Sequence, residues 1–300
     1  MFGETTFEKA ESEMQREALS VLLGKARLSP AALGALFAGD LLNQCVGSAY
    51  GLSEFDVPYF GLYGACSTAA EGITLASLLV SHGALPCAAA VTSSHNAAAE
   101  RQYRSPLEYG GQRAPTAQWT VTGAGAFFIA SAAPGALADV REVLPGIVVD
   151  RGVTDLSNMG AAMAPAACDT LMRYFEATGH RPADFDRIIT GDLGSEGVSI
   201  LGELLAVSGA DAGEKLCDCG TLIYDRERQD VHAGGSGCGC SAVVLAAHFL
   251  PLLQSGTQRD VLFLGTGAMM SPSSTRQGLS IPAVAHLIRL TAPGERRARE

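Results

Sequence analysis

The stretch Tyr63-Gly-Ala-Cys-Ser-Thr-Ala-Ala-Glu-Gly72 is the part of the sequence from which the fold can be worked out. An apolar run, residues 57–63, precedes it, and an alanine- and leucine-rich run, residues 69–80, follows it. This order predicts a strand, a tight turn and a helix, with Cys66 at the turn. Because the first N–H groups of a helix are free and point toward such a residue, the pattern predicts a stabilised thiolate and a lowered pKa for Cys66.

The composition limits the class of protein. The chain has 300 residues, of which 47% are hydrophobic and 17% charged, and this favours a well-buried α/β protein over a disordered one. The formal net charge of −10 argues against a nucleic-acid partner. No apolar run reaches the roughly 18 residues that a membrane-spanning helix needs, and residues 1–15 do not resemble a signal peptide. Eight cysteines without such a signal predict free thiols in the reducing cytoplasm.

Periodicity and capping signals predict alternating helices and strands along the chain. Helices are expected at residues 7–26, 42–51, 67–83 and 161–178, with further helix starts at Ser29-Pro30 and Arg181-Pro182. Strands are expected at residues 35–38, 57–63, 87–91, 119–131 (as a central strand), 140–150, 187–190 and 261–264. The polar residues 96–119 are interpreted as a long loop.

The two halves of the chain share a pattern, which indicates an internal duplication. Pro30 and Asp40 recur at one common offset as Pro182 and Asp192. The cysteine at the start of a helix recurs at Cys240. We therefore predict two similar α/β units, residues 1–146 and 147–300, with mixed but mainly parallel sheets covered by helices.

A duplicated α/β unit with a cysteine at the turn of its first copy resembles the thiolase superfamily, and several longer strings resemble the stage V sporulation protein AD family within it. The resemblance spans residues 2 to about 287. The strings that carry it are Gly61-Leu-Tyr-Gly-Ala-Cys-Ser-Thr68, Val91-Thr-Ser-Ser-His-Asn96, Glu108-Tyr-Gly-Gly-Gln112, Pro115-Thr-Ala-Gln-Trp-Thr-Val-Thr-Gly-Ala-Gly125, Met163-Ala-Pro-Ala-Ala167, Gln229-Asp-Val-His-Ala-Gly-Gly-Ser-Gly-Cys-Gly-Cys-Ser241 and Gly265-Thr-Gly-Ala268.

The resemblance implies a thiolase-like fold and a place in the spore SpoVA apparatus. It implies binding of dipicolinic acid, free or as its calcium chelate, in sporulation and germination. It also implies other SpoVA proteins as partners, a peripheral position on the spore inner membrane, and pairing into a homodimer through an edge strand. Family members have a strand upstream of the first helix, whereas here Met1-Phe-Gly-Glu4 leads straight into it. The first sheet is therefore expected to lack a strand and to expose an edge.

The resemblance also defines what the chain lacks for catalysis. Condensing enzymes of the superfamily add His with His or Asn from the second copy, and thiolases add a further cysteine. The segment Gly191-Asp-Leu-Gly194, where the first partner is expected, has no histidine, and Phe263 stands where a thiolase has its second cysteine. We therefore expect no catalytic residues, with Cys66 at the ancestral nucleophile position. A cysteine-dependent acyltransferase or ketoacyl-synthase-like enzyme remains the alternative.

Candidate ligand-binding residues cluster in the motifs around the two helix starts. They are Cys66, Ser67, His95, Gln118, Asp192, His232, Ser236 and Cys238. The glycine-rich segment 234–239 is suited to holding a carboxylate through backbone N–H groups, and Arg101 and Arg104 could add a guanidinium fork. Four cysteines at positions 217, 219, 238 and 240 raise the alternative of a zinc site, but their spacing is too short, so no metal or cofactor is predicted.

Overall fold

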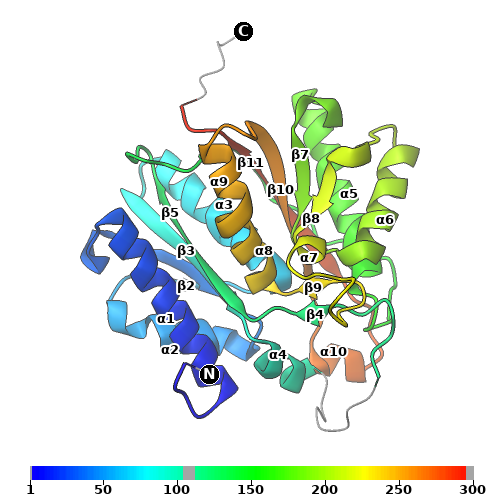
Figure 1. Cartoon of the computed structure of the whole chain (residues 1–300), viewed down its shortest axis with the longest axis horizontal. Helices are drawn as coiled ribbons and strands as arrows, with labels where there is room; N and C mark the ends of the chain where they lie inside the picture. The colour runs from blue at the N-terminus through cyan, green and yellow to red at the C-terminus, as the bar shows by residue number, and fades with distance from the viewer. Residues whose placement is uncertain (1, 104–111, 295–300) are drawn as a thin grey trace.

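Two β-sheets form the framework of the computed structural model, which describes residues 2–103 and 112–294 (Figure 1). The first sheet has the strand order β2 (Tyr59–Gly61), β1 (Leu36–Gly39), β3 (Cys87–Ser94), β5 (Gly123–Ala130). The second has the order β6 (Asp139–Leu144), β11 (Ala283–Thr291), β10 (Asp260–Ala268), β7 (Arg187–Thr190), β8 (Leu216–Asp218). Strands pair in parallel except at β5 and β11. A short parallel pair, β4 (Trp119–Thr120) and β9 (Gly235–Ser236), lies apart from both sheets.

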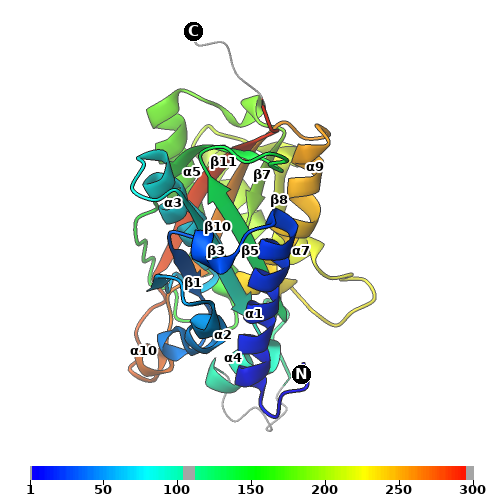
Figure 2. The ribbon, with the colours of Figure 1, turned by 90° about the vertical axis from the view of Figure 1, so that its left-hand side faces the viewer.

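Helices cover both sheets and fill the space between them, which gives five layers (Figures 1 and 2). The outer face of the first sheet is covered by α1 (Phe7–Ala26) and α2 (Val46–Leu52). The central layer holds α3 (Thr68–Ser81) and α8 (Cys238–Val244), and the outer face of the second sheet is covered by α5 (Met159–Thr178) and α6 (Gly194–Val207). Shorter helices are α4 (Asn96–Tyr103), α7 (Cys219–Leu222), α9 (Leu250–Gln254), which follows a π-helical turn at Leu245–Phe249, and α10 (Pro272–Arg276). Within the described residues no helix is long and apolar enough to cross a membrane.

The two sheets confirm the predicted duplication. In the first sheet β2, β1, β3 and β5 follow one another in the same order and directions as β8, β7, β10 and β11 in the second. The second sheet continues beyond β11 with β6, whereas the first sheet, in the part of the chain that the structure describes, ends at β5. Among the described residues the outer edge of β5 is therefore unpaired, whereas the corresponding edge of β11 pairs with β6.

Most long elements lie where the sequence predicted them, and the differences have local causes. The bounds of α1 are those predicted, and α3, β3 and α5 are confirmed. Residues 96–103, predicted as loop, form α4 instead. Ala98 and Ala99 are buried there. The apolar face of this helix is made of small alanine side chains, and a prediction based on large apolar residues does not detect it. The helix starts predicted at residues 30 and 182 are single 3-10 turns, Pro30–Ala32 and Pro182–Asp184.

Three predicted strands were too long or wrongly placed. The run 57–63 contains only the three-residue β2, whose residues are all exposed. The run 119–131 is divided between β4 and β5, and β5 lies at the edge of its sheet, not in the centre. The strand predicted at 140–150 ends at Leu144, and Val149 makes only an isolated bridge to Ala283. In all three cases the apolar run extends beyond the residues that pair in a sheet.

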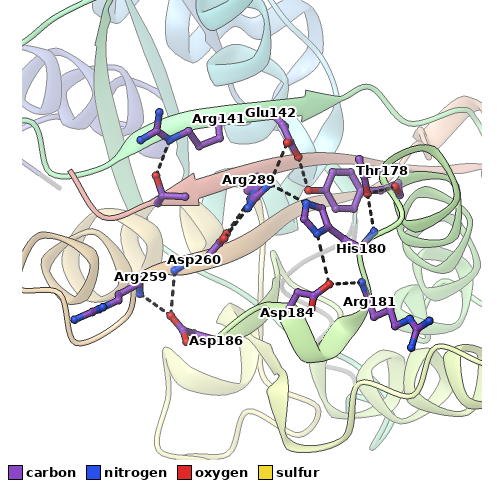
Figure 3. Close-up of polar contacts among 12 residues, drawn as sticks. Arg141, Glu142, Thr178, His180, Arg181, Asp184, Asp186, Arg259, Asp260 and Arg289 are labelled. Atoms are coloured by element: carbon purple, nitrogen blue, oxygen red, sulfur yellow. Dashed lines mark hydrogen bonds and ion pairs between the residues drawn. The ribbon is translucent and has the colours of Figure 1, made fainter. Parts of the chain in front are cut away.

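Arg289 of β11 is the centre of a polar network at the far end of the second sheet (Figure 3). Its guanidinium donates two hydrogen bonds to Asp260, at 2.7 and 2.9 Å, and one to Glu142 at 3.0 Å. The Arg289 side chain is only 7% exposed, so the paired carboxylates are needed to offset the cost of burying its charge. Asp260 begins β10, whereas the pocket described below lies past the end of that strand. The network therefore anchors the sheet away from the pocket.

Candidate functional site

A cavity of about 280 Å³ opens beyond the carboxyl ends of the parallel strands. Open α/β sheets commonly bind ligands at this end, because the loops that leave the strands converge there. Its described lining is mostly apolar or aromatic, with a few polar groups. The residues are Leu41, Tyr63, Ala65, Cys66, Ala99, Glu100, Tyr103, Gln112, Arg113, Ala114, Ala117, Gln118, Thr120, Leu156, Ser157, Met159, Ser236, Ala268 and Met270.

Cys66 lies on a strained turn between β2 and α3, and it lines this cavity. Ala65 has a φ of 49°, in the left-handed region that residues with a Cβ rarely adopt, and a 3-10 turn at Ala65–Ser67 leads into α3. The end of β10 packs directly against the turn: a Cβ on Gly267 would lie 2.2 Å from the carbonyl oxygen of Gly64. Only glycine at position 267 allows this approach, so both halves of the chain hold Cys66 in place.

Asp192 lies fully buried near Cys66 and connects three segments of the second half of the chain. Its Oδ2 accepts hydrogen bonds from Ser236 Oγ and from the backbone N–H of Gly237, each at 2.9 Å. Its Oδ1 accepts one from Thr266 Oγ1 at 2.9 Å. The carboxyl group therefore joins the loop after β7 to the end of β9 and to the last part of β10.

The environment of Cys66 keeps its thiol protonated. Burial raises the pKa of Cys66 well above its usual value, and the neighbouring Asp192 carboxylate raises it further. The predicted lowering of this pKa is therefore wrong, because the side chain is buried and lies near the carboxylate of Asp192. Burial also raises the pKa of Asp192 to about 7, although its hydrogen bond with the Cys66 thiol acts in the opposite direction.

Gln118 forms part of the cavity wall and carries an unpartnered polar atom. Its Nε2 donates to the carbonyl oxygens of Asp192, at 2.6 Å, and of Gly235, at 2.8 Å. Its Oε1 is buried and has no hydrogen-bond partner among the described residues. Because a buried acceptor without a partner is costly, this oxygen is suited to a ligand donor or an ordered water.

The eight predicted site residues divide into three groups: those at the cavity, those buried behind its wall, and the two histidines. Cys66, Gln118 and Ser236 line the cavity, with Asp192 directly behind them. Ser67 and Cys238 are buried behind the wall, where Ser67 Oγ donates to Gly64 O at 2.7 Å and Cys238 Sγ to Ser93 O at 2.9 Å.

Neither predicted histidine is among the residues that line the cavity. His95 packs against Phe7, with ring centroids 5.4 Å apart, and burial lowers its pKa. His232 Nε2 lies 3.6 Å from Asp230 Oδ1 on the surface. Arg101 lies in another groove, paired with Glu8, and Arg104 is outside the described residues.

Sequence reasoning missed an ion pair and a tyrosine pair in the cavity wall. Arg113 Nη2 lies 2.9 Å from Glu100 Oε1, and the two side chains are 10% and 7% exposed. The hydroxyl groups of Tyr63 and Tyr103 are 2.6 Å apart. A helix assignment for residues 96–103 would have placed Glu100 on the buried face of α4 together with Ala99. Across the described part of the chain, no three His, Cys, Asp or Glu side chains are grouped so that they could hold a metal.

Comparison with known proteins identifies relatives of the chain. The family model described as stage V sporulation protein AD (SpoVAD) matches residues 1–291. The stage V sporulation protein AD of Bacillus subtilis (strain 168) is 44% identical over 284 residues, which cover 95% of this chain and 83% of that protein.

Solved structures confirm the predicted thiolase-like α/β fold. The 3-oxoacyl-[acyl-carrier-protein] synthase III from Aquifex aeolicus VF5 has a TM-score of 0.59 at 14% identity, covering 96% of this chain and 85% of that chain. OleA from Xanthomonas campestris has a TM-score of 0.60 at 14% identity, covering 93% and 80%. At these identities the likeness concerns the fold alone.

Proposed function

Because the chain belongs to the stage V sporulation protein AD family, we propose that it is a non-catalytic thiolase-fold protein of the spore SpoVA complex. In this proposal it binds dipicolinic acid, or the calcium chelate of that acid, for uptake during sporulation and release during germination. The site is the cavity beside Cys66. The observation that carries the proposal is the position of Cys66 in the cavity wall, with its Sγ 3.8 Å from Ser236 Oγ, where burial and the charge of Asp192 raise the pKa of the thiol.

The chemistry of the cavity supports binding more than catalysis. A condensing or acyl-transferring cysteine needs a base or dipole that increases its thiolate fraction, whereas Asp192 favours the protonated thiol. No imidazole is among the described lining residues. The described wall instead combines flat aromatic and aliphatic surfaces with one guanidinium group, that of Arg113. This combination suits a small aromatic ring that carries carboxylates.

Titration calorimetry with dipicolinate tests the proposal directly. We expect binding that saturates below millimolar ligand. A pyridine dicarboxylate with its carboxylates at other ring positions should bind at least about tenfold more weakly, a difference of about 1.4 kcal/mol, because the cavity fixes the polar groups around the ring. Equal heats for the two isomers, or none at millimolar ligand, would exclude a specific dipicolinate site.

An acyl-transferring enzyme that uses Cys66 is the second candidate, and the fold shared with an acyl-carrier-protein synthase is the observation in its favour. We expect no covalent adduct on Cys66 after incubation with acyl-coenzyme A at pH 8, and slow alkylation by iodoacetamide, because the buried thiol is protonated. Mass spectrometry of peptides measures both, and urea-unfolded protein serves as the reactive control. An acylated Cys66 peptide from the folded protein would establish the enzyme instead.

We also propose, from family membership, a peripheral position beside other SpoVA proteins at a membrane surface and pairing of two copies along β2. The exposed aromatic side chains of Tyr59 and Phe60 on this edge strand support the pairing. Sedimentation velocity measures it, and a monomer at tens of micromolar protein would contradict it.

A further inference from the structure

An ion pair lies in the described part of the cavity wall. Arg113 is the only cationic side chain among the described lining residues, and Glu100 lies beside it at 2.9 Å. Both side chains are at most 10% exposed, so water and salt screen their charges weakly. A carboxylate ligand that approaches Arg113 is therefore also repelled by Glu100.

Arg113 is held in place by more than Glu100. Its guanidinium lies over the Trp119 ring, 3.8 Å from the centroid, and its Nη1 donates to the carbonyl oxygen of Gln118 at 2.9 Å. Glu100 Oε1 also accepts a longer hydrogen bond, 3.3 Å, from Thr120 Oγ1. Removing the charge of Glu100 should therefore leave the Arg113 guanidinium close to its present position. Its positive charge would then no longer be offset by the Glu100 carboxylate.

We propose that Glu100 is a specificity-determining residue that makes affinity in this cavity depend on the net charge of the ligand. The inference rests on the proposed function, because it concerns carboxylate ligands of the same cavity. Glu100 weakens binding of a free dicarboxylate and has little effect on a chelate in which a divalent cation balances the two carboxylates. Arg113 supplies the attraction and Glu100 sets how much of it an anion experiences.

The variant Glu100→Gln tests this, because the amide oxygen can still accept from Arg113 and Thr120 while the charge is lost. By calorimetry we expect the Kd of the free dipicolinate dianion to fall about tenfold. The Kd of the monoanion picolinate should fall less, and that of the calcium chelate should change less than twofold. Glu8→Gln removes the carboxylate of another arginine pair, with Arg101, outside the cavity and is the matched control. It should leave all three Kd values unchanged.

A second variant keeps the test decisive if an unpaired arginine impairs folding. In the double variant Glu100→Gln/Arg113→Gln no charge of the pair remains, so the Kd of the dipicolinate dianion should rise. The difference between the Kd values of the dianion and of the calcium chelate should be smaller than in the wild type.

The outcomes separate the two proposals. An equal effect of Glu100→Gln on dianion and chelate, or weaker binding of the dianion, would overturn the role of Glu100 while the wild type still binds dipicolinate. Absence of dipicolinate binding by wild type and variants alike would overturn the proposed function itself and the inference with it.

Discussion

Replacing Asp192 by alanine is expected to destabilise the protein by about 3–5 kcal/mol, the range for removing one member of a fully buried polar network. The side chain is completely buried and accepts hydrogen bonds from Ser236, Gly237 and Thr266. Alanine would leave these three donors without their acceptor, and each buried group that loses its partner costs about 1–3 kcal/mol. It would also leave a void beside Cys66.

Asparagine at position 192 should cost much less, about 1 kcal/mol. Its amide oxygen can still accept from Ser236 and Gly237, and its NH₂ group can donate to Thr266, whose hydroxyl is able to reverse its role. Asparagine also has no ionisation to suppress in the buried site. The expected order of stability at pH 7 is therefore wild type, then Asp192→Asn, then Asp192→Ala, with a wide gap before the last.

Urea denaturation at pH 7 measures this order. Asp150 is the matched control, because it is an exposed aspartate whose Oδ2 also accepts a serine hydroxyl, from Ser280 at 2.6 Å. Asp150→Ala should hardly change the midpoint. If Asp192→Ala is as stable as Asp150→Ala, the hydrogen bonds of the Asp192 carboxyl group do not contribute to the free energy of unfolding.

The parts of the fold that could be predicted are those encoded by neighbouring residues. The turn at Cys66 is bounded by runs of clear composition, and the start and end of α1 carry local signals such as the Thr6 cap. The duplication was visible because proline and aspartate recur at one spacing. Strand ends were less predictable, because strand-favouring β-branched residues continue through Val121 and Thr122 although the chain there leaves one strand and enters another.

The properties of the site depend on residues far apart in the sequence, and this is why they were harder to predict. The pKa of Cys66 is decided by its burial and by Asp192, a residue of the other half, so a local argument from the helix start gave the wrong direction. The ion pair of Glu100 and Arg113 became apparent only once α4 and the loop before β4 were placed. His232 was a candidate because the resemblance implies that its glycine-rich segment faces Cys66, yet among the described lining residues this segment contributes Ser236 instead.

Stability should also fall as pH rises from about 5 to 8, and Glu11 of α1 is one identifiable cause. Glu11 is fully buried under α1, where Ser93 Oγ donates to its Oε1 at 2.9 Å and its Oε2 has no partner. Burial, reinforced by the charge of Asp40, raises the pKa of Glu11 to about 8. Gln15 lies one helical turn away and its buried Oε1 is also unpartnered, so a proton on Glu11 would supply the donor that this pair of acceptors lacks.

The sign of the pH effect follows from proton binding. Between the unfolded pKa of about 4.5 and the folded pKa of about 8, the folded protein keeps a proton on Glu11 that the unfolded chain has released. The stabilisation is thus complete below pH 4.5 and is lost as pH rises, at up to about 1.4 kcal/mol per pH unit for this one group. Asp192, whose pKa is raised to about 7, adds a loss of the same sign that ends near pH 7.

Glu11→Gln isolates the contribution of Glu11. The amide is neutral at every pH, its oxygen can accept from Ser93 and its NH₂ can donate toward Gln15, so the variant mimics the protonated wild type. We expect urea denaturation from pH 5 to 9 to show a clearly smaller slope for Glu11→Gln, which should be the more stable protein at pH 8. Glu17→Gln, on the exposed side of the same helix, should keep the wild-type slope. Equal slopes for Glu11→Gln and the wild type would mean that Glu11 is ionised in the folded protein, and the buried network under α1 would then have to hold a second charge beside Asp40.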